Sequence, residues 1–265
     1  MIRGLLSRGY AAINRVLRPL GLRLHKTHAP TRTFEDFFAH LRSLGMEFRT
    51  VIDVGVARGT PSIYRAFPRA KYLLVEPLEE FRPTLERLTS RLDATYVLAA
   101  AGATDGEVEL HVHSHLSGSS LLRQAEGTTL DGVTRRVRSV RLDGALPTVV
   151  ERPCLLKIDT QGSELEVLDG LGRRIAEMDV LIIEASLLPF RVGAPVLAEL
   201  IARLDTLGFA VYDILEGHVR ALDGALAQVD LVFVPKTGEL RRDPRFFSPD
   251  QLARYARQAT GHGER

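Results

Sequence analysis

Short apolar runs alternate with helical segments along most of this chain, and this alternation limits its possible folds more than any other feature. The runs end in a polar residue or a glycine, which is typical of buried strands, and the segments between them space apolar residues as a helix does. The predicted strands cover residues 50–54, 71–76, 96–101, 155–159 and 180–184, and the predicted helices cover residues 61–67, 81–92, 163–171 and 194–207. Strands that alternate with helices form a mostly parallel sheet with helices on both faces.

Two parts of the chain depart from this alternation. Residues 108–115 and 137–142 alternate polar and apolar side chains as antiparallel strands do, and a segment rich in glycine and serine separates them. Residues 209–215 and 229–234 are joined without a helix, which predicts a hairpin at an antiparallel edge. The expected fold class is therefore α/β, with a Rossmann-like, doubly wound and mostly parallel sheet that ends in an antiparallel edge hairpin.

Three regions are expected along the chain. A length of 265 residues is enough for one large domain with a sizeable core, and the pattern assigns residues 46–236 to that domain. Residues 1–45 are predicted to form an N-terminal helical extension, with helices at residues 2–18 and 33–44. Residues 237–265 are expected to be a C-terminal tail.

Composition excludes several classes of protein. The formal net charge of +2 gives no global preference for nucleic acid, and the single cysteine, Cys154, rules out a disulfide framework or a cysteine-rich zinc site within one chain. No apolar run approaches the length of about 18 residues that is needed to span a bilayer. Because arginines interrupt the N-terminal apolar residues, a cleaved signal peptide is not expected, and the protein is predicted to be cytoplasmic.

The N-terminus is basic and amphipathic. Residues 1–30 hold six Arg or Lys side chains and no acidic one. This segment either packs on the domain or in a homodimer contact, with its arginines in water, or makes a peripheral contact with an anionic membrane through residues 1–20. The scarcity of aromatic side chains in the segment favours the first alternative.

The turn after the first strand predicts a ligand site. In open α/β sheets ligands bind beyond the carboxyl ends of the strands. Gly55 allows a sharp turn and a close approach of the backbone, and Gly59 precedes a helix whose N-terminal amides favour an anionic group such as a carboxylate. Asp53, at the tip of the strand, is placed to accept a hydrogen bond from an ammonium group, directly or through water. These groups suit the amino-acid part of a nucleoside cofactor.

The next two strands add the nucleoside part of the site. Glu76 ends the second strand about twenty residues beyond the glycines, where an acidic side chain binds the 2′,3′-diol of a ribose. Ala101 and Gly102 end the third strand, where the edge of an adenine would pass. NAD uses the same acidic residue, but its glycine fingerprint is G-x-G-x-x-G, whereas the glycines here are spaced G-x-x-x-G. The spacing favours S-adenosylmethionine.

A longer motif resembles a known family. Residues 155–168 read LLKIDTQGSELEVL, and the K-I-D-x-Q-G-x-E core in this segment resembles the signature of the FkbM methyltransferases. Further matches follow in the family's order at residues 51–59, 75–77, 101–106, 119–122 and 141–143. The resemblance spans about residues 50–235 and implies the class I methyltransferase fold, a contact of Pro77 with the cofactor, and methyl transfer from S-adenosylmethionine. The usual acceptor in the family is a hydroxyl on a sugar or polyketide-like molecule.

Four polar residues are candidates for the chemistry. A poorly acidic alcohol benefits from a general base, and Asp159, which ends the fourth strand, is predicted to be that base or to position the acceptor. Glu184 ends the fifth strand and is expected to join Asp159 as a catalytic residue. Gln161 and Glu164 are predicted to bind the acceptor, although each could instead fix the loop. The alternative for Asp159 is a local role at the helix entry, where Ser163 and Glu166 fit a capping box.

No metal site is predicted. Asp159 and Glu184 could together bind a divalent cation through oxygen, but two carboxylates are a weak pattern for one. The alternating residues His111, His113 and His115 invite a metal hypothesis, yet such a row is more typical of a solvated strand face.

The sequence therefore predicts an S-adenosylmethionine-dependent O-methyltransferase that acts on a small-molecule or glycan acceptor and not on nucleic acid. Two alternatives belong to other classes: an NAD-dependent oxidoreductase, and a non-catalytic module that binds a nucleoside.

Overall fold

The computed structural model describes residues 13, 16, 32–125 and 131–260 of the chain. The predicted helix at residues 2–18 and the membrane or dimer contact proposed for it lie outside the described residues, apart from Ile13 and Val16. None of the helices in the described ranges is long and apolar enough to cross a membrane.

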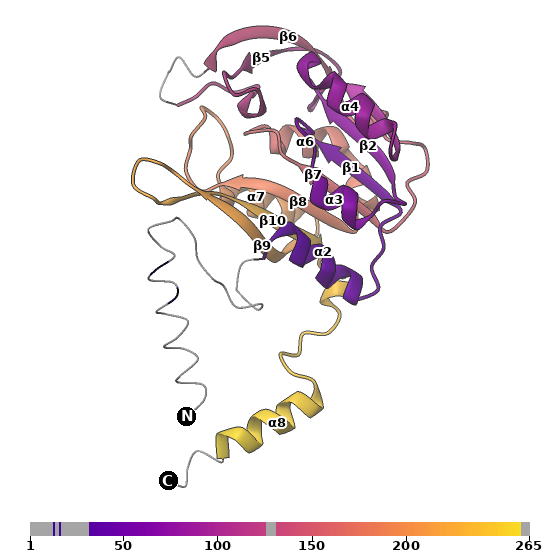
Figure 1. The fold of residues 1–265 in the computed structure, drawn as a ribbon, viewed down its shortest axis with the longest axis vertical. Helices are drawn as coiled ribbons and strands as arrows, with labels where there is room; N and C mark the ends of the chain where they lie inside the picture. The colour runs from indigo at the N-terminus through magenta and orange to yellow at the C-terminus, as the bar shows by residue number, and fades with distance from the viewer. Residues whose placement is uncertain (1–12, 14–15, 17–31, 126–130, 261–265) are drawn as a thin grey trace.

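A seven-stranded sheet forms the centre of the molecule, with the strand order β3-β2-β1-β7-β8-β10-β9 (Figure 1). Its strands are β1 Thr50–Val54, β2 Lys71–Glu76, β3 Asp93–Leu98, β7 Cys154–Ile158, β8 Val180–Ser186, β9 Phe209–Val219 and β10 Leu226–Pro235. The strands from β3 to β8 pair in parallel, whereas β10 is antiparallel to both β8 and β9. The predicted fold class, a doubly wound and mostly parallel sheet with an antiparallel edge hairpin, is confirmed.

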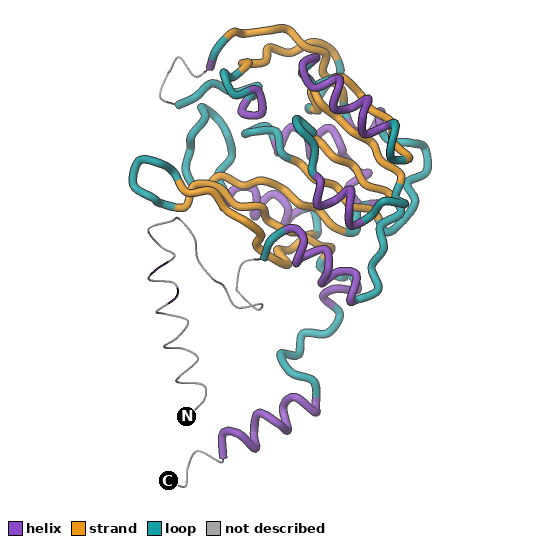
Figure 2. The backbone as a smooth tube through the Cα atoms, in the orientation of Figure 1, coloured by secondary structure: helices purple, strands orange, loops and turns teal. Residues whose placement is uncertain are grey.

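Helices cover both faces of this sheet (Figure 2). The helices are α2 Phe34–Ser43, α3 Pro61–Ala66, α4 Arg82–Thr89, α5 Leu142–Ala145, α6 Glu164–Leu171 and α7 Leu197–Thr206. Successive residues of a strand point to opposite faces, so Val51 packs with α2, α3 and α4, whereas Ile52 packs with α6 and α7. Because both faces are covered, β1, β7 and most of β8 are buried along their whole length, which explains why they read as continuous apolar runs.

A second, three-stranded sheet lies beyond the carboxyl ends of the central strands (Figure 1). It consists of β4 Ala100–Ala101, β5 Gly106–Val112 and β6 Val133–Val140, in the order β4-β6-β5. The predicted strand at residues 96–101 is therefore divided between the two sheets. The predicted strand at residues 108–115 ends early, because the side chain of Ser119 accepts the backbone hydrogen bond of His113 and the chain turns back.

The segments that precede and follow the sheet in the sequence pack differently. Phe37, Phe38 and Leu41 of α2 are fully buried in the core beside β1, so part of the predicted N-terminal extension belongs to that core. Leu44, just after the end of α2, is 54% exposed, so the buried face of this helix ends at Leu41. At the other end, α8 Pro249–Thr260 stands clear of both sheets (Figure 1).

Candidate functional site

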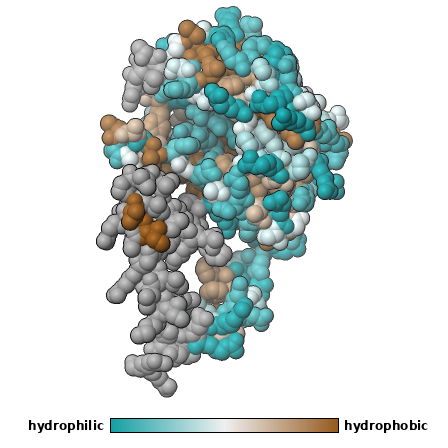
Figure 3. Space-filling view, in the orientation of Figure 1, coloured by the Kyte–Doolittle hydropathy of each residue, from teal (hydrophilic) through white to brown (hydrophobic). Residues whose placement is uncertain are grey.

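A cavity of about 460 Å³ opens at the carboxyl ends of the central strands, between the two sheets. It falls in the size range of small-molecule sites. Its walls come from the β1–α3 turn, the tip of β2, β4, the loop at residues 116–121, the tips of β7 and β8, and the hairpin β9–β10. In the space-filling view the recess appears as a hollow in a mostly hydrophilic face (Figure 3).

The β1–α3 turn forms one wall of the cavity and depends on glycine. Gly55 has a φ of +79°, and a Cβ added there would lie 1.8 Å from the carbonyl oxygen of Asp159. The turn is therefore pressed against the tip of β7, and only glycine fits this approach. Ala57 and Gly59 also have positive φ, at 45° and 94°, so the turn presents backbone to the cavity over several residues. The predicted contact residues Gly55 and Gly59 both line the cavity.

Glu76 reaches the cavity from the tip of β2. Its Oε2 accepts a hydrogen bond of 2.8 Å from the N–H of Ala57, and its Oε1 accepts one of 2.9 Å from the N–H of Leu78. The residue is 4% exposed, and burial raises the pKa of its carboxyl to about 7 despite these two bonds. Pro77 and Ala101, the other predicted contacts, line the cavity nearby. A carboxylate held at both oxygens by backbone presents its remaining lone pairs to two neighbouring hydroxyl donors.

Asp53 is placed differently from the prediction. It does not line the cavity and is fully buried. Its Oδ2 accepts hydrogen bonds from Tyr64 Oη at 2.6 Å and Thr60 Oγ1 at 3.2 Å, so the side chain turns back toward α3. Its Oδ1 lies 4.0 Å from Lys157 Nζ and makes no hydrogen bond among the described residues. The geometry therefore supports a role for Asp53 in fixing α3 and Lys157 behind the cavity wall, not a direct contact with a ligand.

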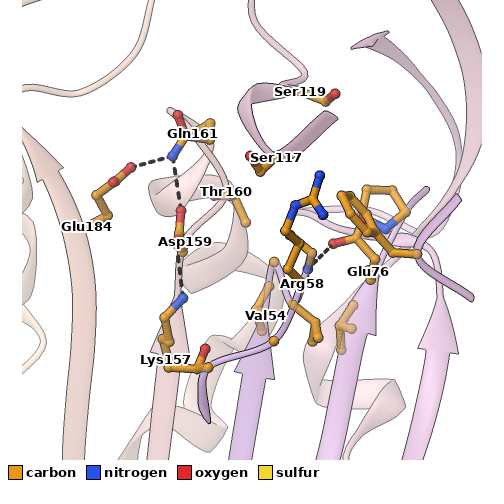
Figure 4. Close-up of a pocket in the computed structure, with 18 of the residues that line it drawn as sticks. Val54, Arg58, Glu76, Ser117, Ser119, Lys157, Asp159, Thr160, Gln161 and Glu184 are labelled. Atoms are coloured by element: carbon orange, nitrogen blue, oxygen red, sulfur yellow. Dashed lines mark hydrogen bonds and ion pairs between the residues drawn. The ribbon is translucent and has the colours of Figure 1, made fainter. Parts of the chain in front are cut away.

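Asp159 extends from the end of β7 into the cavity, and Lys157 lies beneath it (Figure 4). Lys157 Nζ donates to Asp159 Oδ2 at 3.0 Å, and the lysine side chain is only 6% exposed. Burial opposes ionisation of Asp159, but the attraction of Lys157 and a hydrogen bond from Gln161 outweigh it and hold the pKa of Asp159 below its usual value. The same ion pair keeps Lys157 charged, because Asp159 and Asp53 raise its pKa against the effect of burial.

Gln161 joins Asp159 to Glu184. Its φ of +59° turns the side chain between the two carboxyls, where Nε2 donates to Asp159 Oδ1 at 3.1 Å and to Glu184 Oε2 at 2.6 Å (Figure 4). Glu184 also accepts a hydrogen bond of 2.8 Å from Gln228. Burial, followed by the nearby charges of Asp159 and Asp230, raises the pKa of Glu184 to about 9. At neutral pH one carboxyl is therefore ionised and the other is protonated, a separation typical of catalytic pairs.

Glu164 lies behind the loop and not in the cavity. It is 4% exposed, and its Oε1 accepts hydrogen bonds from the N–H of Gly162 at 2.9 Å and from Thr160 Oγ1 at 3.1 Å. This position fits the loop-fixing alternative rather than contact with an acceptor. The predicted capping box is wrong, because the side chain of Ser163 makes no capping bond and Glu164 binds the loop amides instead.

Several residues that line the cavity were not predicted from the sequence. The hairpin contributes Glu216 and His218 from β9 and Asp230 from β10, and burial raises the pKa of Asp230 to about 6. Asp230 pairs in register with Glu184 across β8 and β10. The sequence signal that could have located it is the aspartate itself, because a charged residue inside the apolar run at residues 229–234 is unusual. Ser117, Ser119 and Arg58 line the opposite side.

The histidine row differs from a solvated strand face. His111 is 8% exposed and its Nδ1 lies 3.2 Å from Thr134 Oγ1, whereas His113 and His115 come after the end of β5. The three side chains therefore do not share one strand face. In the part of the chain that the structure describes, no group of three or more His, Cys, Asp or Glu side chains is arranged to hold a metal ion.

One family model and several solved structures are similar to this chain. Residues 53–211 match the family model described as "Methyltransferase FkbM domain". A comparison with curated protein sequences finds no match. Among solved structures, the chain resembles the N-methyltransferase NodS from Bradyrhizobium japonicum WM9, at 6% identity over 76% of this chain and 93% of that chain, with a TM-score of 0.45. It also resembles the magnesium protoporphyrin IX methyltransferase from Synechocystis PCC 6803 with bound S-adenosylmethionine, at 11% identity over 76% of this chain and 77% of that chain, with a TM-score of 0.42.

Proposed function

Because the chain belongs to the FkbM methyltransferase family, whose members depend on S-adenosylmethionine, we propose that it methylates a hydroxyl group on a sugar, glycan or polyketide-like acceptor. The match covers residues 53–211, which include the β1–α3 turn, Glu76 and the Asp159 loop.

The cavity wall near β1 and β2 suits the cofactor. Glu76 offers carboxylate oxygens at the position where a ribose diol is bound in folds of this type, and its two backbone hydrogen bonds hold it there. The backbone of Gly55 and Gly59 lines the wall next to it. S-adenosylmethionine supplies a methyl group that its sulfonium already activates, so the protein has to place the acceptor and manage one proton.

The position of Asp159, which lines the cavity and pairs with Lys157 at 3.0 Å, is the observation that carries the proposal. A hydroxyl must lose a proton as its oxygen gains the methyl group, and a carboxylate within reach can accept that proton. Asp159 lines the cavity, and Lys157 and Gln161 together hold it ionised and oriented. In the proposed mechanism the hydroxyl donates to Asp159, and the proton passes to this carboxylate as the oxygen–methyl bond forms and the methyl–sulfur bond breaks, which would leave S-adenosylhomocysteine.

The rest of the cavity favours a hydroxyl-rich acceptor. Its walls away from Glu76 present the hydroxyls of Ser117 and Ser119 and the side chains of Glu216, His218 and Asp230. These groups donate and accept hydrogen bonds at several points, as recognition of a polyol requires. Protonated Glu184 adds a further donor at neutral pH.

A transfer assay tests the proposal. Purified protein is incubated with S-adenosylmethionine labelled in its methyl group and a panel of sugars, oligosaccharides and polyketides, and the product is analysed by NMR. We expect label on an oxygen of at least one hydroxylated acceptor. Label found only on nitrogen or carbon would refute the O-methyltransferase proposal while leaving the family assignment intact.

A further inference from the structure

Arg191 is a buried arginine that joins three segments around the cavity. It lies in the loop between β8 and α7, and only 9% of its surface is exposed. Backbone hydrogen bonds on either side of it, from Ala125 to Phe190 and from Val192 to Arg123, pair this loop with the end of the segment that follows β5. The backbone of the loop is therefore held on both sides of Arg191, which fixes the point from which its side chain extends.

The guanidinium points at the loop that carries the FkbM motif. Its Nη2 donates to the carbonyl oxygen of Gly118 at 2.8 Å and to Gln161 Oε1 at 3.4 Å. A Cβ added at Gly162 would lie 3.2 Å from Cδ of Arg191, so the motif loop packs directly on the stem of the arginine. Ser120 fastens the same loop from another direction, since its Oγ donates to the carbonyl oxygen of Gln161 at 2.7 Å.

The two ends of the Gln161 amide have opposite partners. Its Nε2 has two hydrogens, and the two carboxyls of Asp159 and Glu184 accept them. Its Oε1 faces Arg191, which can only donate. An amide turned over would place its oxygen against the ionised oxygen of Asp159 and its NH₂ group against the guanidinium, and both contacts would be repulsive.

We propose that Arg191 is a positioning residue, which holds the Gln161 amide in the one orientation that directs both of its hydrogens at Asp159 and Glu184. Arg191 thereby acts on the reaction through Gln161 without touching the reacting atoms. The catalytic consequence rests on the proposed role of Asp159 as the base, but the orientation itself does not.

The pKa of Asp159 is a measurable quantity that depends on the orientation of the Gln161 amide. A hydrogen bond from Gln161 favours the ionised form, so losing it raises the pKa of Asp159. Other charged or titratable groups also act on this carboxyl from the surrounding strands and from α6: Glu76, Lys157, Glu164, Glu184, His218 and Asp230. The test must therefore separate the effect of orientation from the effect of removing one positive charge.

A double-mutant cycle makes this separation. Asp159 is titrated by NMR of protein labelled with ¹³C at its side-chain carboxyls, in the wild type, R191M, Q161A and the double variant. We expect R191M to raise the pKa of Asp159 in the presence of Gln161, and to raise it less in Q161A, where only the loss of charge remains. Equal rises in the two backgrounds, or no rise in either, would overturn the proposal.

Control variants and folding checks separate a specific effect of Arg191 from a general effect of losing an arginine or of misfolding. Arg203→Met removes a surface arginine that pairs with Asp169, and it is expected to leave the titration of Asp159 unchanged. Thermal unfolding and calorimetry with S-adenosylhomocysteine check that each variant is folded. If R191M does not fold, R191Q, which fills the buried site with a neutral amide, takes its place with the same two outcomes.

Turnover gives a second readout once an acceptor is known. In R191M the acid limb of the kcat profile should move to higher pH, whereas the KM for S-adenosylmethionine should stay within about twofold. A failure of the transfer assay would remove the base role of Asp159 but would leave the NMR titration, and with it the orientation of Gln161, as an independent result.

Discussion

The backbone N–H of Ala57 donates to Glu76 Oε2 across 2.8 Å, which ties the turn after β1 to the tip of β2. Ala57 holds a positive φ of 45° to make this bond, and Leu78 holds the other oxygen of the same carboxyl. The carboxylate is therefore oriented by backbone before any ligand arrives. Such preorganisation lowers the entropic cost of binding.

Replacing Glu76 with Gln should weaken the binding of S-adenosylhomocysteine by about tenfold or more, because the amide offers only one acceptor where the carboxylate offers two. The amide nitrogen would also meet the N–H of Ala57 or Leu78, donor against donor. Calorimetry measures the change. Glu107→Gln, in an exposed residue of β5, is the matched control and should bind as the wild type does.

The affinity for S-adenosylhomocysteine should depend on pH through Glu76. Its pKa is raised to about 7 by burial, and the ionised form is the one that accepts two hydroxyl donors. Binding therefore favours the deprotonated carboxyl, and the affinity should fall by up to about tenfold per pH unit below that pKa. Calorimetry from pH 5 to 9 tests this. A flat profile in the wild type, or the same slope in E76Q, would contradict the assignment.

Asp159→Asn should lower turnover by about a hundredfold or more, since the amide cannot accept the hydroxyl proton. Binding of S-adenosylhomocysteine should stay within about twofold, because the cofactor wall near Glu76 is unchanged. Asp169→Asn, on the surface of α6 where Asp169 pairs with Arg203, provides the control. Wild-type turnover in D159N would remove Asp159 from the mechanism.

Two buried tyrosines allow a matched test of the role of Asp53. Tyr64 Oη donates to the carboxylate of Asp53 at 2.6 Å, whereas Tyr72 Oη donates to the neutral carbonyl of Phe67 at 2.8 Å. Hydrogen bonds to charged groups contribute more, so Y64F should cost about 1.5–3 kcal/mol of unfolding free energy and Y72F about 0.5–1.5 kcal/mol. Urea denaturation measures both. An equal loss of unfolding free energy in the two variants would show that the hydrogen bond to Asp53 stabilises the fold no more than the one to a neutral carbonyl.

Gly55→Ala should destabilise the fold by about 3 kcal/mol or more, because the new Cβ would lie 1.8 Å from the carbonyl oxygen of Asp159 and the φ is positive. Gly144→Ala is the comparison. Gly144 lies in α5 with open space around it, so this substitution should be neutral or stabilise the helix by about 0.5–1 kcal/mol. Thermal and chemical unfolding distinguish the two variants.

Most of the central sheet could be predicted from the chain because its strands are buried on both faces. A run such as residues 50–54 is apolar along its length and ends at a turn, so its limits are visible. The small sheet was not foreseen as a separate unit. Its strand β4 is only Ala100–Ala101, too short for any periodic signal, and what defines it is a partner 39 positions away.

The site was predicted to the extent that it depends on strand tips. Glu76 and Asp159 were found because the ends of parallel strands meet at one edge of the sheet. Asp53 stands at the same kind of tip, yet its side chain turns back to Tyr64, and no local pattern distinguishes the two orientations. Arg191 reaches the motif loop, and Asp230 reaches the cavity, through long-range pairing, which periodicity does not reveal.

The order of strands in the main sheet also has a consequence for biosynthesis. β10 lies between β8 and β9, so during translation β9 leaves the ribosome before the strand that joins it to the sheet. Until residue 235 has emerged, β8 carries an open edge, and open edges invite pairing with other chains. A nascent or truncated protein that stops between β9 and β10 is therefore expected to aggregate, although every residue matched by the family has by then been synthesised.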